Sequence, residues 1–227
     1  MKEIVLDLET TGLEYNNGHR IIEIACVELL NFVPTGKVYQ TFINPERESS
    51  LSAKEKHGIT DVFLKDKKLF REIVPSFLKF INDSPLIAHN GAEFDIPFLN
   101  HELKNNNFNI IKNPIIDTLI LARKKYPGSP ANLGALCRRF DIDLSAREKH
   151  GALIDAKLLA KVYLELKGGQ QPNLILDSKN EKKINKDTRF FEKKILKDRK
   201  FILSNEEEEK HKEFIKKIKN PIWNQYK

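Results

Sequence analysis

The sequence predicts an α/β fold, in which a mixed five-stranded sheet is flanked by helices and followed by a C-terminal extension with a short helix. Three observations predict it. Three strand-like apolar runs follow one another within residues 3–45. Helical and strand-like patterns then alternate over residues 51–166. Beyond the stretch "GGQQPN" at 168–173, the composition becomes rich in Lys and Asn, which indicates the end of the compact domain.

The first three strands are expected at residues 3–8, 20–30 and 37–45. A turn around Pro34 and Gly36 joins the second to the third. Strands so closely spaced favour an antiparallel meander.

Two helices follow the meander. The stretch 51–59 predicts a short helix, in which Ser52 and Glu55 have the spacing of a capping box. Residues 69–82 predict a longer one, because apolar side chains recur there at 70, 73, 74, 77, 78 and 81. The remaining predicted elements are a strand in 84–90, a helix in 92–105, a strand in 113–118, and helices near 118–125, 131–139 and 151–166.

Composition excludes several classes of protein. The chain has 227 residues, of which 40% are hydrophobic and 31% charged, as in ordinary globular proteins. No apolar run approaches the ~20 residues that span a bilayer, and no export signal opens the chain, so we expect a cytoplasmic protein. Cys26 and Cys137 lie in apolar patterns and are expected to be reduced thiols of the core.

The net charge of +7 belongs to the end of the chain. Residues 178–227 contain 16 Lys and Arg against nine acidic residues, whereas residues 1–177 are neutral. Such a basic run is most often a solvated surface, although it could also contact DNA phosphates.

Two carboxylates interrupt the first strand at its carboxyl end. Asp7 and Glu9 are two residues apart, so they point to the same face of the strand. Ionised carboxylates placed together in a core need a partner or a metal ion. Taken alone, this pair more often lies on a solvent-exposed face.

Two later stretches strengthen the metal hypothesis. Asp95 follows a buried strand and lies in the first turns of a helix that tolerates Pro97 only near its start. His150 and Asp155 open the last helix of the domain. Their spacing of five corresponds to ~140° around a helix, so we place Asp155 on the helix and His150 in the segment before it.

The motifs "DLETTG", "HNGAEFD" and "HGALIDA" resemble, in order and context, the three motifs of the DEDDh 3′–5′ exonucleases. The resemblance covers residues 3–170 well. It is closer still to the proofreading (epsilon) subunits of bacterial DNA polymerase III, and it implies a ribonuclease-H-like fold. It also implies that Asp7, Glu9, Asp95 and Asp155 hold two Mg²⁺ or Mn²⁺ ions and that His150 is the general base. Ligation by carboxylate oxygen suits such hard cations.

The resemblance also implies a set of substrate contacts. The implied reaction is hydrolysis of the 3′-terminal phosphodiester of DNA, which releases nucleoside 5′-monophosphates. Other interpretations stay open: Gly12 as a turn glycine, Ser52 as a helix cap, Asn90 as a turn residue and Phe94, favoured here, as core. The residues expected to meet the 3′-terminal nucleotide are Asp7, Glu9, Thr10, Thr11, Gly12, Leu13, Ser52, His57, Asn90, Phe94 and Asp155.

The segments after the exonuclease domain (1–169) resemble partner-binding parts of the same family. Gln171, Leu174 and Leu176, within 170–177, resemble a peptide that binds the sliding clamp (beta), although an ordinary linker would also fit. A basic linker is expected at 178–203.

The last segment, 204–227, resembles the part that binds the polymerase's catalytic (alpha) subunit. Ser204 is its predicted helix cap, and Phe214, Ile218 and Trp223 are its predicted anchors. The same helix could instead dock on its own domain.

Two further functions compete with the proofreading hypothesis. One is an RNA exonuclease of the same DEDDh family, and the other is a catalytically idle adaptor between clamp and polymerase. The five filled catalytic positions argue against the adaptor.

Overall fold

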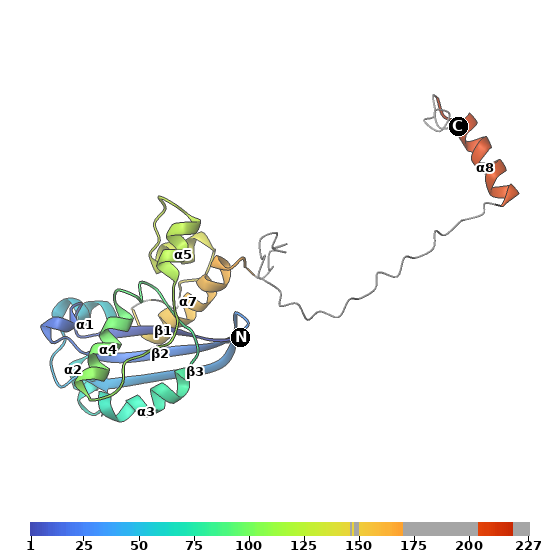
Figure 1. The fold of residues 1–227 in the computed structure, drawn as a ribbon. Helices are drawn as coiled ribbons and strands as arrows, with labels where there is room; N and C mark the ends of the chain where they lie inside the picture. The colour runs from blue at the N-terminus through green and yellow to red at the C-terminus, as the bar shows by residue number, and fades with distance from the viewer. Residues whose placement is uncertain (146, 148–149, 170–203, 220–227) are drawn as a thin grey trace, which may run out of the picture. The chain divides into compact units, whose positions relative to one another are not determined.

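The computed structural model describes residues 1–145, 147, 150–169 and 204–219 (Figure 1). The chain divides into two compact units, residues 1–175 and 176–227, and each is described by itself. The first unit contains the sheet and seven of the helices, and the second contains helix α8 (Asn205–Lys216).

A six-stranded mixed sheet forms the centre of the first unit, with strand order β4-β3-β2-β1-β5-β6. The first three strands form the predicted antiparallel meander, and the other three pair in parallel. All five predicted strands are present, but the turn between β2 and β3 falls at Asn31 and Phe32, both with positive φ, so Pro34 and Gly36, predicted as the turn, lie within β3. The sixth, β4, has only two residues, which is too short for any periodic pattern in the sequence. The strands are β1 (Lys2–Thr10), β2 (Ile21–Leu30), β3 (Val33–Asn44), β4 (Lys68–Leu69), β5 (Leu86–Ala88) and β6 (Ile115–Asp117).

The helices of the first unit follow the predicted order, with one five-residue helix, α2, that the sequence did not predict. One cap differs from the prediction. Ser50, not Ser52, caps α1 by accepting a hydrogen bond from the backbone N–H of Ala53, so the helix begins two residues earlier than the capping-box spacing indicated. The helices are α1 (Leu51–His57), α2 (Asp61–Lys65), α3 (Phe70–Ile81), α4 (Asp95–Asn105), α5 (Thr118–Lys125), α6 (Leu133–Arg139) and α7 (Ala152–Leu166), with a 3₁₀ turn at Tyr15–Asn17.

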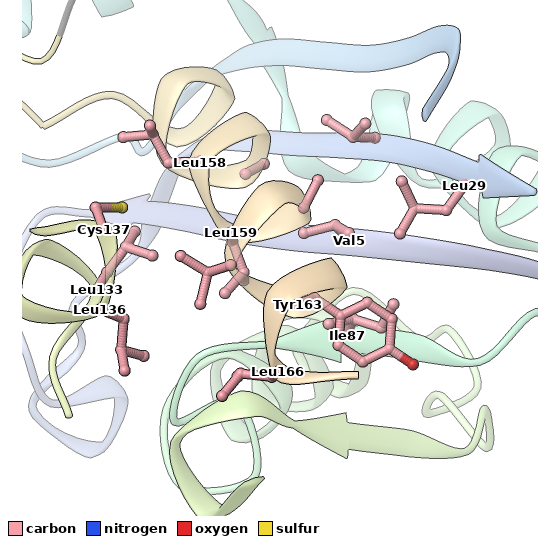
Figure 2. Packing of buried hydrophobic residues seen from close by; sticks show 14 of the residues in the cluster. Val5, Leu29, Ile87, Leu133, Leu136, Cys137, Leu158, Leu159, Tyr163 and Leu166 are labelled. Atoms are coloured by element: carbon pink, nitrogen blue, oxygen red, sulfur yellow. The ribbon is translucent and has the colours of Figure 1, made fainter. Parts of the chain in front are cut away.

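The two faces of the sheet build two cores. Along β1, Ile4, Leu6 and Leu8 face the core formed with α3 and α4. Val5 faces the other core, where α7 packs over β1 and β2. Figure 2 shows Val5 and Ile87 of the sheet beside Leu159 and Tyr163 of α7. Because side chains alternate along a strand, Asp7 and Glu9 share the face of Val5 and turn toward α7.

The second unit retains the predicted cap. The hydroxyl of Ser204 accepts a hydrogen bond from the N–H of Glu207, whose side chain accepts from the N–H of Ser204 in return. Trp223 and the clamp-like residues Gln171, Leu174 and Leu176 lie outside the described residues. Within the part of the chain that the structure describes, no helix has the length and apolar character needed to cross a bilayer.

Candidate functional site

The carboxyl end of β1 opens into a cavity of about 230 Å³. It brings together residues from β1, the turn after it, α1, the start of α4 and the start of α7. Three predicted metal ligands and the predicted general base lie on its wall. The lining residues are Asp7, Leu8, Glu9, Thr10, Gly12, Leu13, Ser52, Ala53, Lys56, His57, Phe94, His150 and Asp155.

Asp95 is buried as the first residue of α4. Burial raises the pKa of its carboxyl group, and the nearby backbone of Leu8, the residue between Asp7 and Glu9, offsets part of that rise. The loop before it is fastened by Asp117, whose carboxylate oxygens accept from the N–H groups of Asn90 (3.1 Å) and Ala92 (3.2 Å). Asp95 therefore lies beside β1, although it does not line the cavity.

Asp155 is buried in the first turn of α7, and His150 precedes that helix with its side chain 48% exposed. Two hydrogen bonds hold this region against the sheet and α1. The N–H of Ala152 donates to Glu23 Oε2 (3.1 Å), and the N–H of His150 donates to the carbonyl of Lys56 (3.1 Å). As predicted, Asp155 is helical and His150 is not.

Crowding raises the pKa values of three of these carboxyl groups. Burial, followed by the charges of Asp95 and Asp155, raises the pKa of Asp7 well above its usual range. Burial and the charge of Asp155 raise the pKa of Glu9 to about 8, and burial raises that of Asp95 to about 7. Carboxylates packed in this way need a cation before all of them can ionise at neutral pH.

The donor set fits a hard divalent cation. One ligand atom from each of Glu9, His150 and Asp155 lies within 4.8 Å of the other two. Asp7 and Asp95 do not belong to that group of three. After burial, the charges of Asp95, Asp155 and Glu9 raise the pKa of Asp7, so these carboxylates act on one another. Carboxylate oxygens beside a single imidazole suit Mg²⁺ or Mn²⁺ and lack the thiolates of a structural zinc site.

His57 offers an unused donor to the cavity. It is only 5% exposed, and its Nδ1 accepts the N–H of Ile59 at 2.9 Å. Burial lowers its pKa, so the ring is neutral at pH 7 and carries its proton on Nε2. That Nε2 is buried without a hydrogen-bond partner among the described residues. A buried N–H without a partner is uncommon, and its place beside the cavity makes it a candidate contact for a bound ligand.

The turn after β1 is held from within. Thr10 Oγ1 donates to the carbonyl of Gly12 at 2.6 Å, and Thr11 Oγ1 lies 3.0 Å from Nδ1 of His19. A Cβ on Gly12 would stand 2.4 Å from the His19 ring, so glycine is needed there for packing. Leu13 is 69% exposed on the rim of the cavity, where it can meet a nucleotide base.

Of the other predicted substrate residues, two line the cavity and one does not. Ser52 is exposed on the cavity wall, and Phe94 lines the cavity while also packing on the core beside Phe98. Asn90 does not line the cavity; it adopts a left-handed turn conformation with φ 64°. Its substrate contact stays a prediction.

Sequence reasoning missed three residues of the site: Glu23, Lys56 and Arg147. Glu23 had a signal, because it is one of two acids, with Glu28, inside the apolar strand "RIIEIACVELL". Lys56 lies on the cavity wall, and Arg147 pairs with Asp155. Neither could be told from an ordinary surface cation in the sequence.

Comparison with known proteins identifies the family of the chain. The Exonuclease (RNase_T) family matches residues 4–163. The DNA polymerase III subunit epsilon of Rickettsia typhi is 48% identical over 96% of this chain and 97% of its own length. That of Buchnera aphidicola from Baizongia pistaciae is 40% identical over 98% and 96%.

Solved structures show the same fold. Exonuclease X in complex with 5′ overhanging duplex DNA has a TM-score of 0.57 at 24% identity, over 72% of this chain and 90% of that one. The zinc-bound Escherichia coli exonuclease I–ssDNA complex has a TM-score of 0.65 at 17% identity, over 75% and 41%. The predicted ribonuclease-H-like exonuclease fold is thereby confirmed.

Proposed function

The chain belongs to the epsilon-subunit family of the exonucleases, the proofreading 3′–5′ exonucleases of DNA polymerase III, and from that membership we propose a chemical role for each residue of the cavity. Asp7, Glu9, Asp95 and Asp155 hold two Mg²⁺ or Mn²⁺ ions, and His150 is the general base.

The observation that carries this proposal is the crowding of the carboxylates. Asp7 and Glu9 share one face of β1, Asp95 lies beside the strand near Leu8, and Asp155 faces them from α7. Burying these acids without a cation costs free energy, which shows in the raised pKa values. A protein gains from such a site only when a cation occupies it.

When bound, paired divalent cations polarise a phosphate and make an attacking water more acidic. The side chains supply the rest. Burial and the nearby Arg147 charge lower the pKa of His150, so its ring is neutral at pH 7 and can take a proton. His57 Nε2 donates to an oxygen of the terminal nucleotide, which satisfies its buried N–H. Leu13 lies against the last base.

This arrangement selects for frayed ends rather than for a base sequence. The cavity accepts a single strand, and a mispaired end unpairs at a cost lower by up to a few kcal/mol. A mismatch therefore reaches the site more often.

Digestion of 3′-labelled primer–templates tests the function. We expect mismatched ends to be removed faster than matched ends, nucleoside 5′-monophosphates as products, and no reaction in EDTA. Asp7→Ala should lower the rate by at least about a hundredfold, whereas Asp66→Ala, at an exposed acid outside the cavity, should not. Preference for RNA oligonucleotides would favour the RNA exonuclease, and full activity of Asp7→Ala would remove the site assignment.

The second unit is proposed to bind the polymerase. Phe214 is 60% exposed on α8, a helix of 12 residues, which is too short to be stable without a docking surface. Phe214, Ile218 and Trp223 would contact the catalytic (alpha) subunit. Trp223→Ala should weaken copurification with that subunit while the variant still digests single-stranded DNA. Unchanged copurification would contradict the assignment.

The peptide 170–177 is proposed to bind the sliding clamp (beta) through Gln171, Leu174 and Leu176. Support comes from its place after the exonuclease domain (1–169) and before the linker 178–203. Gln171→Ala together with Leu174→Ala should weaken clamp binding and leave exonuclease activity unchanged.

A further inference from the structure

Arg147 holds both carboxylate oxygens of Asp155. Its Nε donates to Oδ1 at 2.6 Å and its Nη2 donates to Oδ2 at 2.7 Å, a two-pronged ion pair. The pair is largely buried, with 16% of the Arg147 side chain and 6% of the Asp155 side chain exposed. In a buried pair of this kind, loss of one partner leaves the other charge uncompensated, which costs more than breaking a surface ion pair.

His150 shares this contact. Its Nδ1 lies 3.1 Å from Arg147 Nη2 and 3.2 Å from Asp155 Oδ2. A carboxylate offers about four acceptor positions. Arg147 uses two of them and His150 lies at a third, so little of Asp155 is left for another ligand.

Arg147 also differs from the other Lys and Arg residues in its ion pairing. In the described part of the chain, no other Lys or Arg forms an ion pair with Asp7, Glu9, Asp95 or Asp155. A divalent ion bound by Asp155 would lie within a few ångströms of the guanidinium and would be repelled by it.

We propose that Arg147 is an exchangeable counter-cation of this site: it neutralises Asp155 while no divalent ion is bound and releases Asp155 when the ion enters. This inference rests on the proposed metal site. Among the described residues, the printed contacts of His150 Nδ1 are with Arg147 Nη2 and Asp155 Oδ2, so release of Arg147 also leaves the Asp155 carboxylate as the acceptor there. An Nδ1–H donated to Asp155 keeps the lone pair on Nε2, the arrangement that a general base needs.

Metal affinity tests the exchange without any turnover. The full chain and its Arg147→Met variant are titrated with Mn²⁺ by calorimetry in the absence of DNA, with Arg71→Met, an exposed arginine of α3, as the charge-matched control. We expect Arg147→Met to bind Mn²⁺ about tenfold more tightly, because a partly buried competitor has been removed, and Arg71→Met to bind as the parent does. Equal or weaker binding by Arg147→Met would overturn the proposal, since Arg147 would then be holding Asp155 in place for the ion.

A second measurement uses the unaltered chain, in case Arg147→Met does not fold. The ¹H–¹⁵Nε signal of Arg147, assigned by its absence in Arg147→Lys, is followed during titration with Mg²⁺. Exchange requires it to move away from its carboxylate-bonded position as the site saturates, and a signal unchanged at saturation would refute the proposal. If the parent chain binds neither ion, the proposed metal site fails as well; if it binds both ions and only the Arg147 effects are missing, the failure is confined to this inference.

Discussion

Removal of divalent cations should make the stability of the first unit fall as pH rises, against the usual trend for carboxylates. Glu9 has its pKa raised from 4.5 to about 8 in the folded state, so between these values the native protein retains a proton that the unfolded chain releases. Stability then falls by up to about 1.4 kcal/mol per pH unit for each retained proton. From pH 6 to 8, Glu9 alone should cost about 2 kcal/mol. Asp95, raised from 3.8 to about 7, should add about 1 kcal/mol.

Urea unfolding followed by circular dichroism, in EDTA at pH 6, 7 and 8, measures this loss. The lowered pKa values of His57 and His150 act in the opposite direction below about pH 6.5. The informative quantity is therefore the difference between the parent chain and Glu9→Gln, because both chains contain these histidines. Glu9→Gln should recover most of this loss of stability, about 2 kcal/mol. Glu55→Gln, at an exposed position of α1, should show the same pH dependence as the parent.

Saturating Mg²⁺ should reverse the sign of the pH dependence of stability. A bound cation stabilises the ionised carboxylates, so protons then compete with the ion and stability should rise with pH. If the chelated parent and Glu9→Gln show the same pH dependence, Glu9 is not held protonated in the folded state and the crowding argument is wrong.

Three further substitutions test individual contacts. Glu23→Ala should lower the free energy of unfolding by about 2 kcal/mol and slow exonuclease activity, because the buried N–H of Ala152 loses its acceptor. Glu23→Gln should recover the stability. Equal loss in both variants would mean that the charge of Glu23 matters and the hydrogen bond does not. Because Lys56 lines the cavity, Lys56→Met should raise KM for oligonucleotides and make the salt dependence of kcat/KM shallower by about one power of the salt concentration. Lys54 pairs with Asp61, so Lys54→Met should leave that dependence unchanged. Identical slopes for the parent and Lys56→Met would exclude a phosphate contact. His57→Gln should raise KM for a mononucleotide ester more than it lowers kcat, and an unchanged KM would mean that Nε2 meets no substrate.

The parts of the site that were predictable lie where local pattern and position agree. Asp7 and Glu9 share a face because strand side chains alternate, and nothing distant is needed to deduce it. Asp155 and His150 follow from helix geometry in the same way. The mixed sheet was predictable from the close spacing of the first three strands and from the alternation of helices and strands that follows, whereas the order of the six strands was not predicted.

The parts that were not predictable depend on contacts between distant residues. Glu23 and Ala152 are 129 positions apart, yet one hydrogen bond between them sets where α7 begins over the sheet. Ser50 rather than Ser52 caps α1, because the capping spacing alone cannot show which hydroxyl meets the free N–H. Such choices are made by tertiary packing, which overrides local preference.

Arg147 shows why the same limit applies to chemistry. Its neighbours in the sequence carry no sign of a catalytic role, since a basic residue between Leu144 and His150 reads as surface. Only the fold shows that its guanidinium meets the one buried carboxylate of α7. A cluster of carboxylates is stabilised by a cation both with and without a bound metal ion. Without the ion, the chain itself supplies one, the Arg147 guanidinium beside Asp155. The proposed exchange therefore follows from the same electrostatics that support the proposed metal site, and the Mn²⁺ titration of Arg147→Met tests both ideas through different outcomes.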